Sequence, residues 1–506
     1  MVILALLALA CEKEENSPDW VVIPDCEAGS VVLRETWTGA QLLGSDDQTV
    51  FDWSQEPNYA GPGMAAVDLD GDGWLDIAIA NPLGPSHVLM GSAEGFSKGS
   101  LVVPQSFAIG AGDLNGDGLP ELLLSRWDGA AELVGVANAS GDYTWSEVPD
   151  TIHDQGVGWS LADMDGDGDL DAYNARHRGI PDMATIMSGQ EEGVQSKLFR
   201  NEGGTLVLDE TALSRKQGMG MTFLGQWLDA NEDGHLDLYQ VRDFGPFVTP
   251  NLLLLGDGKG GFSGSDGSAN IAIYSMGVAV GDVDGNGSPD LYITNIGSPV
   301  LLSNQAGRYV EATAAQGAYL PPSAERQSSW GVDLVDLDLD GFPEAAVLFG
   351  SVQFWDEPAT IVDSEGTFWK EGAAQPDALL WNKDGKLAEV PGLGDTAVGR
   401  GLVRGDWDRD GDPDLMTASW TPDLDIQIAS YETLGGCGHG ATLQVPVGTR
   451  ITTLRGTQWL APANSFSSSA HELYFSVDIS DAVEVQLPGH EAQTYFMQAG
   501  DVLRIP

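Results

Sequence analysis

One short acidic motif occurs seven times in this chain, and it restricts the fold more than any other feature. The first copy is D-L-D-G-D-G-W-L-D at residues 68–76, and the last is D-W-D-R-D-G-D-P-D at residues 406–414. The other copies occupy residues 113–121, 163–171, 229–237, 282–290 and 336–344. Successive copies start 45, 50, 66, 53, 54 and 70 residues apart. These distances fit a repeated unit of four β-strands, with insertions in the third and sixth units and a candidate insertion in the fourth.

The motif offers oxygen atoms at alternate positions. Positions 1, 3, 5 and 9 carry a carboxylate in 25 of 28 places, and the exceptions, Asn115, Asn231 and Asn286, also have a side-chain oxygen. Calcium prefers six to eight oxygen ligands, and the glycine at position 6 of every copy permits the tight turn that such a loop needs. The predicted ligands are the side chains at positions 1, 3, 5 and 9 and the backbone carbonyl at position 7: Asp68, Asp70, Asp72, Trp74, Asp76, Asp113, Asn115, Asp117, Leu119, Glu121, Asp163, Asp165, Asp167, Asp169, Asp171, Asp229, Asn231, Asp233, His235, Asp237, Asp282, Asp284, Asn286, Ser288, Asp290, Asp336, Asp338, Asp340, Phe342, Glu344, Asp406, Asp408, Asp410, Asp412 and Asp414.

The overall charge has two interpretations. The chain has 76 acidic and 23 basic residues and a net charge of -53, which is also typical of a solubilising or salt-adapted surface. Carboxylates crowded into one loop repel one another without a cation, so seven copies favour up to seven structural calcium ions over that alternative. The same charge argues against nucleic acid and anionic lipid as partners, because affinity for both depends on Lys and Arg.

The residues around the loops predict strands, which excludes an EF-hand, because that site needs flanking helices and a glutamate at position 12. Residues 65–67 and 77–80 alternate as strands on either side of the first loop, residues 197–200 predict a third strand, and residues 308–311 predict a fourth. These units resemble the FG-GAP and VCBS repeats of integrin-type propellers. The resemblance covers about residues 61–431 and implies an all-β fold, a seven-bladed β-propeller with structural calcium at one rim.

The last unit lacks an obvious fourth strand, and we expect residues 31–36 to supply it. After residue 437 the repeat ends, and residues 447–452, 471–475 and 483–489 alternate as a small β-sandwich. These segments resemble the ASPIC/UnbV domain, although Leu487 stands where tryptophan is usual and Ser476 where glycine is usual. A propeller followed by this domain resembles the cartilage-acidic-protein-like family. That resemblance implies an exported binding protein without an established enzymatic role.

The N-terminus predicts export. Residues 2–10 form an apolar run too short to span a bilayer, and residues 7–11 resemble a bacterial lipobox that ends at Cys11. An ordinary cleaved signal peptide is the alternative. Cys26 and Cys437 remain, on either side of the repeats, and in an oxidising compartment they favour a disulfide over a metal or catalytic site.

The expected organisation is a lipoprotein-type signal peptide (1–10), a tether (11–28), the propeller (29–434) and the ASPIC/UnbV-like domain (435–506). The expected location is the bacterial outer membrane or cell surface, or the secreted fraction, with membrane contact only through the lipid anchor.

We expect a monomeric adhesion or scaffold protein, not an enzyme, with an unidentified protein or glycan partner. The alternative is a hydrolase or lyase with its site in the axial channel. His153 and His177 are its candidates. His177 lies between Arg176 and Arg178, and a solvated loop or an ion pair with the acidic surface is favoured over an active site there. The insertions at 179–196 and 353–376 are candidate recognition loops. Three aromatic residues in the second insertion would either contact a ligand or hold the loop down: Trp355, Phe368 and Trp369.

Overall fold

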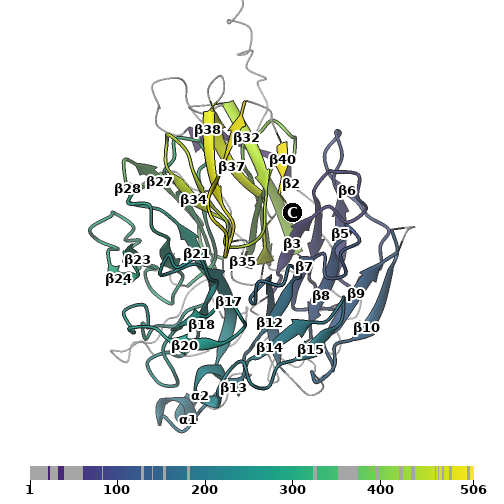
Figure 1. The fold of residues 1–506 in the computed structure, drawn as a ribbon, viewed down its shortest axis with the longest axis vertical. Coiled ribbons are helices and arrows are strands. Elements are labelled where there is room, and N and C mark those ends of the chain that lie inside the picture. Colours follow the sequence, from purple (N-terminus) through teal and green to yellow (C-terminus); the bar gives the residue numbers. More distant parts are fainter. Residues whose placement is uncertain are drawn as a thin grey trace, which may run out of the picture.

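The computed structural model shows an all-β chain built mainly from antiparallel sheets (Figure 1). The described residues are 21–22, 32–38, 61–82, 84–126, 130–138, 141–151, 155–178, 183–322, 328–350, 374–390, 393, 398–420, 426–434, 439–461, 463–464, 467–469, 472–477, 481–498 and 502–505.

Each acidic loop joins the first two strands of its own sheet, and each strand pairs with the next one along that sheet. This arrangement confirms that the loops are strand hairpins and not EF-hands. The first four sheets consist of β3 (Met64–Val67), β4 (Asp76–Ile79), β5 (His87–Met90) and β6 (Ser97–Lys98); β7 (Ala108–Gly112), β8 (Glu121–Ser125), β9 (Leu133–Ala137) and β10 (Tyr143–Glu147); β11 (Gly156–Ala162), β12 (Asp171–Arg176), β14 (Lys197–Asn201) and β15 (Leu206–Leu208); and β17 (Thr222–Leu228), β18 (Asp237–Arg242), β19 (Leu252–Gly256) and β20 (Phe262–Gly264).

The other three repeat sheets follow the same order. They consist of β21 (Val278–Gly281), β22 (Asp290–Ile293), β23 (Val300–Gln305) and β24 (Arg308–Glu311); β25 (Ser329–Val335), β26 (Glu344–Phe349), β27 (Ala378–Lys383) and β28 (Lys386–Val390); and β29 (Val398–Gly405), β30 (Asp414–Trp420) and β31 (Ile426–Leu434) with β2 (Val32–Thr38) and β1 (Val21–Val22). In the last sheet the N-terminal strand β2 pairs with β31, in the register Val32 to Leu434.

Burial falls from the first strand of a sheet to the fourth. In the fifth sheet β21 and β22 are buried along their whole length, whereas β24 has one buried residue, Tyr309. Strands buried on both faces need continuous apolar sequence, while outer strands keep one polar face. The first strands therefore line the centre of the molecule.

Hydrophobic clusters lie between neighbouring sheets and link them into a ring. One cluster combines Leu123 of the second sheet with Trp159 of the third, and another combines Met64 of the first sheet with Met416 of the last. Glycines allow the first strands to approach closely at the centre: a Cβ at Gly158 would lie 2.8 Å from the backbone oxygen of Phe223. Sheets arranged in this way form a propeller-like fold.

The insertion in the third unit is packed against the ring. It contains helix α1 (Met183–Met187) and strand β13 (Val194–Gln195), which pairs with β16 (Met219–Gly220) just after helix α2 (Arg215–Gly218). Ile186 of α1 is fully buried in a cluster with Met221 and Phe244. The described part of this insertion is therefore anchored and does not project as a free loop.

The C-terminal region forms two small sheets that share one hydrophobic cluster, with Leu443 and Phe475 from the first sheet and Ile451 and Val483 from the second. The first sheet consists of β37 (Glu472–Val477), β32 (His439–Gln444) and β40 (Val502–Arg504), and the second consists of β34 (Thr457–Trp459), β33 (Arg450–Thr452), β38 (Asp481–Gln486) and β39 (Gln493–Met497).

A hairpin of the C-terminal region, β35 (Ala463–Asn464) and β36 (Ser467–Ser468), enters the centre of the ring (Figure 1). It contacts the first strands β3, β7, β17, β21, β25 and β29, and β36 pairs with β3 in parallel. The Ser467 hydroxyl accepts a hydrogen bond of 3.1 Å from the Met64 backbone N–H. This hairpin therefore occupies the loop end of the ring centre.

Candidate metal centres

The backbone of each acidic loop is folded around the carboxylate at position 1. In the first loop, Asp68 accepts hydrogen bonds of 2.8 Å from the N–H groups of Gly71 and Gly73. The N–H of the position 6 glycine donates to position 1 in all seven loops. These glycines have φ between 86° and 98°, a conformation that glycine adopts without a steric penalty.

Position 9 ties each loop to its own sheet. One oxygen of Asp76 accepts from the Leu69 N–H at 2.9 Å, and the other accepts from the Gly91 N–H at 2.8 Å at the end of the third strand. Position 2 donates to position 9 in all seven loops, and the bond to the end of the third strand recurs in all but the second. The carboxylate at position 9 therefore has a structural role besides its predicted one as a ligand.

In five of the loops, three carboxylates each bring one oxygen to within 4.8 Å of the others. Four of these groups use positions 1, 3 and 9, and the group in the third loop uses positions 1, 3 and 5. The groups are Asp68, Asp70 and Asp76; Asp163, Asp165 and Asp167; Asp282, Asp284 and Asp290; Asp336, Asp338 and Glu344; and Asp406, Asp408 and Asp414. A hard cation that prefers oxygen ligands fits these groups.

The second and fourth loops differ because asparagine occupies position 3. The Asn115 amide donates to Glu121 at 2.7 Å, and the Asn231 amide donates to Asp233 at 2.9 Å. In both loops, the amide N–H of the asparagine therefore points at a carboxylate that we predict to be a calcium ligand. At position 7, whose carbonyl was the predicted ligand, the N–H donates to the side-chain oxygen of position 5 in all seven loops.

Burial and crowding keep these carboxylates from ionising freely. Burial, opposed only in part by backbone hydrogen bonds, raises the pKa of Asp76 to about 7 and that of Asp290 to about 8. Burial, followed by the carboxylates of Asp338 and Asp336, raises the pKa of Glu344 well above its ordinary value. A divalent cation would offset this repulsion directly.

Position 4 is a feature of the loops that the motif analysis missed. Its φ is between 57° and 76° in all seven copies. Four copies have glycine there, and the others have Glu232, Leu339 and Arg409. The recurring glycine was a readable signal, because a positive φ costs other residues about 1–2 kcal/mol.

The C-terminal region rests on the loops of the later units. The Gln458 amide donates to Asp336 at 3.0 Å, and the Gly489 N–H donates to the Gly234 carbonyl at 2.5 Å. A cavity of about 930 Å³ lies between this region and the loops of the first four units. Asp68, Asp113, Asp163, Val447 and Arg504 are among the residues that line it.

His177 and Arg176 are buried, so the solvated-loop interpretation of this segment is wrong for both residues. The exposed fraction of His177 is 1%, and its Nε2 lies 3.5 Å from Asp243. Its ring stacks on Phe223, with centroids 4.3 Å apart, and Phe223 meets Trp330 edge-on at 6.1 Å.

The same stack crosses the centre of the ring at the end away from the loops. The Arg400 guanidinium lies 4.2 Å from the Trp330 ring. Phe223, Trp330 and Arg400 come from the first strands of the fourth, sixth and seventh sheets. Because the fourth and sixth sheets are not neighbours, the contact between Phe223 and Trp330 spans the centre. Side chains from the fourth, sixth and seventh sheets therefore meet at this end of the ring centre.

Several predicted features lie outside the described residues. These are the signal peptide, the tether apart from β1 (Val21–Val22), most of the second insertion, and Cys11, Cys26, Cys437, His153, Trp355, Phe368 and Trp369. Among the described helices, none has the length and apolar character needed to cross a membrane.

Comparison with protein families matched an FG-GAP-like repeat to residues 68–124 and 229–293. Comparison with curated proteins gave no match.

Solved structures with some similarity include BBS1N in complex with ARL6DN, at 10% identity and a TM-score of 0.46, covering 79% of this chain and 96% of that one. Another is the V. cholerae biofilm matrix protein Bap1, at 12% identity and a TM-score of 0.32, covering 93% and 85%. A third is the alpha-L-arabinofuranosidase arb93a from Fusarium graminearum, at 11% identity and a TM-score of 0.37, covering 74% and 95%. Each TM-score is below 0.5, so no property of these proteins transfers to this chain. The sequence match and the sheets together describe FG-GAP-like repeats in a propeller-like, all-β fold.

Proposed function

We propose that this chain is an exported seven-bladed β-propeller that calcium stabilises and that serves as a surface binding or scaffold protein. The observation that carries the proposal is the gathering of three carboxylate oxygens within 4.8 Å in five separate loops. Calcium bound there would neutralise carboxylates that otherwise repel, and it would fix each hairpin to its sheet. In the two loops with asparagine at position 3, rotation of the side-chain amide would direct its oxygen at the ion, so these loops could bind calcium as well.

The cavity between the loops and the C-terminal region supports a binding role. Its volume of about 930 Å³ is in the range of small-ligand sites, about 300–1,000 Å³. One wall belongs to the repeats and the other to the C-terminal region, so both parts of the chain would contact a bound molecule. We place recognition of a protein or glycan partner at this cavity.

The centre of the ring supports a non-enzymatic role. A propeller enzyme would need an open site there, yet the β35–β36 hairpin occupies the loop end and the stack of His177, Phe223 and Trp330 occupies the other. The buried ion pair between Arg404 and Asp333 secures the hairpin, because Asp333 also accepts from the Ser469 hydroxyl at 3.2 Å. In the proposed cellular setting, Cys11 would carry the lipid that anchors the protein.

Thermal unfolding with about 1 mM calcium and with chelator, together with metal counting by mass spectrometry, tests the proposal. Sites with a Kd of about 10⁻⁴ M would each add about 1.4 kcal/mol at that concentration. We expect several bound ions and a large fall in the melting temperature on chelation. No bound calcium and no shift would reject the proposal.

A further inference from the structure

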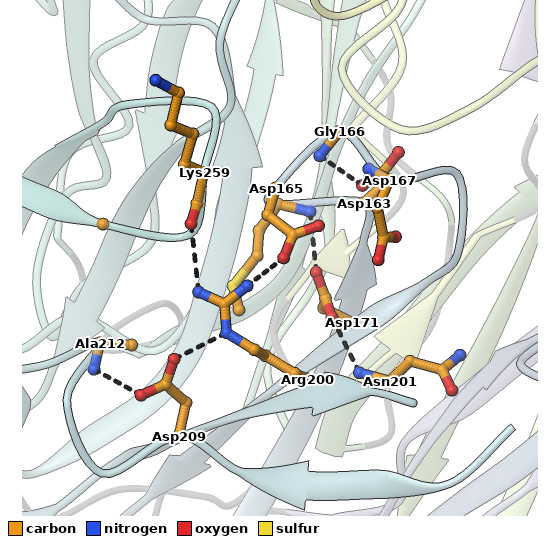
Figure 2. Close-up of polar contacts among 12 residues, drawn as sticks. Asp163, Asp165, Gly166, Asp167, Asp171, Arg200, Asn201, Asp209, Ala212 and Lys259 are labelled. Atoms are coloured by element: carbon orange, nitrogen blue, oxygen red, sulfur yellow. Dashed lines mark hydrogen bonds and ion pairs between the residues drawn. The ribbon is translucent and has the colours of Figure 1, made fainter. Parts of the chain in front are cut away.

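Arg200 reaches the third loop from a strand of the same unit, and no other unit has an arginine at the equivalent position. It lies on β14, and its guanidinium forms an ion pair with Asp165, the position 3 carboxylate of the same unit (Figure 2). Its Nε donates to Asp209 at 2.7 Å, and its Nη2 donates to the Lys259 carbonyl of the fourth unit at 3.1 Å. One side chain therefore joins the third loop, the fourth strand region and the neighbouring unit.

The neighbouring turn is shaped to admit this side chain. Gly260 follows Lys259, and a Cβ at Gly260 would lie 2.1 Å from Nη2 of Arg200. Asp209 accepts hydrogen bonds from the N–H groups of Thr211 and Ala212. Figure 2 shows the bond from Ala212, on the side of Asp209 away from Arg200. Residues of both the third and the fourth unit are therefore arranged to accommodate the Arg200 side chain.

The carboxylates of the third loop are arranged differently from those of the loops that resemble it most. In the first, fifth, sixth and seventh loops, the clustered oxygens come from positions 1, 3 and 9. In the third loop, position 9 is replaced by position 5, Asp167, although Asp171 is present and accepts from the Asn201 N–H at 2.9 Å. Asp165 is thus paired with Arg200 while Asp171 stays outside the group.

Strand register identifies the residue equivalent to Arg200 in every unit. Phe199 pairs with Ala172 just as Leu302 pairs with Leu291, so Arg200 corresponds to Ser303 of the fifth unit. The Ser303 hydroxyl donates to Asp284 at 2.8 Å, which is again position 3. The equivalent residues of the other units are Met90, Val136, Leu255, Trp381 and Glu432. Arginine is therefore found at this position in the third unit alone.

We propose that Arg200 is the resident cation of the third loop, and that this loop joins the third and fourth units without calcium or with much weaker calcium binding than the others. This inference rests on the proposed calcium role of the loops. A guanidinium already neutralises Asp165, and an incoming cation would have to displace it and break its bonds to Asp209 and Lys259. The serine of the fifth unit is neutral, so it leaves the charge of Asp284 available.

The test is a residue exchange in the full chain, with calcium ions counted by native mass spectrometry during a calcium titration. Arg200→Ser gives the third unit the arrangement of the fifth, and we expect it to bind one more ion than the unchanged protein. Ser303→Arg makes the reverse exchange, and we expect it to bind one ion fewer or to bind that ion at least tenfold more weakly. Arg308→Ser is the control, because it removes one positive charge from an exposed strand position.

The outcomes separate the two proposals. If the unchanged protein binds calcium but both exchanges leave the number and the affinity of the ions as they were, the inference about Arg200 is wrong and the proposed function stands. If no variant binds calcium, the proposed function fails and the inference fails with it. A crystal structure of the unchanged protein grown with calcium gives an independent answer if a variant does not fold, since an ion held by Asp165 would overturn the inference.

Discussion

The two ends of the ring of sheets contain different kinds of polar group. At the loop end, the position 1 carboxylate of each loop is held by hydrogen bonds from within the same nine residues, such as those from Gly71 and Gly73 to Asp68. At the opposite end, Arg176, His177 and Arg242 are buried among residues from different sheets. A local motif can be repeated, whereas the opposite end is assembled once from distant segments.

The difference also concerns charge. The loop end has an excess of carboxylates, and in the two proposals a cation from outside or, in the third unit, Arg200 would neutralise part of it. At the opposite end, basic and acidic side chains lie next to each other, as in the contact of 3.5 Å between His177 and Asp243. Calcium should therefore change the stability of the loop end, while changes at the opposite end should act independently of calcium.

The largest expected effect is that of Trp330→Ala, at the opposite end. Trp330 is 1% exposed and contacts both Phe223 and Arg400, so its removal should lower the free energy of unfolding by about 3–5 kcal/mol. Denaturant unfolding with calcium and with chelator should show the same loss. Trp145→Ala on the outermost strand β10, where the side chain is half-buried, is the control with a smaller loss. A loss at Trp330 that calcium restores would contradict the independence of the two ends.

The second largest expected effect is a pH dependence of folding stability that comes from Glu132 at the opposite end. Burial raises the pKa of Glu132 to about 8, so the folded protein keeps a proton that the unfolded chain releases. This contribution to stability is complete below the ordinary glutamate pKa and is lost as the pH rises through about 8.

The variant Glu132→Gln cannot titrate, which isolates this effect. We expect the stability of the unchanged protein, relative to this variant, to fall from about pH 5 to about pH 9 in unfolding experiments. The exposed Glu147 of β10 provides the control, because Glu147→Gln should leave the pH profile unchanged. Parallel profiles for the unchanged protein and Glu132→Gln would refute the prediction.

A smaller effect should follow from Gly116→Ala in the second loop. Gly116 has a φ of 74°, and a Cβ added there would have no heavy atom within 4 Å, so only backbone strain should matter, at about 1 kcal/mol. Because this strain acts on a predicted ligand loop, calcium affinity should fall as well, as measured by calorimetry. Gly95→Ala has similar strain, with a φ of 90°, but lies in an outer turn. It should lower stability without changing calcium binding, and equal effects of the two variants on calcium would argue against a ligand role for the second loop.

The smallest effect should be that of Arg450→Gln, between the C-terminal region and the fourth loop. Arg450 lies 3.8 Å from Glu232, and both side chains are about a third exposed or less. An ion pair of this kind contributes less than about 1 kcal/mol and is screened by salt. Unfolding at low and high ionic strength should show a loss that disappears at high salt. A loss that persists would mean that the contact of Arg450 with Trp459, at 5.5 Å, is the more important one.

Much of the repeat architecture was readable from the sequence. The strands predicted around the loops agree with the structure, as in β3, β4 and β24, because an apolar run bounded by a glycine-rich turn leaves few alternatives. The glycines at position 6 have the positive φ that the tight turn required. The positive φ at position 4 was missed because three copies use other residues there.

The sequence by itself determined which residues form the hairpins and which carboxylates each loop contains, since both depend on contacts within a few residues. Only the tertiary structure decided that His177 is buried, that the β35–β36 hairpin enters the ring and that Arg200 pairs with Asp165. Those contacts join segments 35 or more residues apart, as in the separation of Arg200 and Asp165. No local pattern encodes them, because they form only when whole sheets pack and bring distant side chains into the same low-dielectric space.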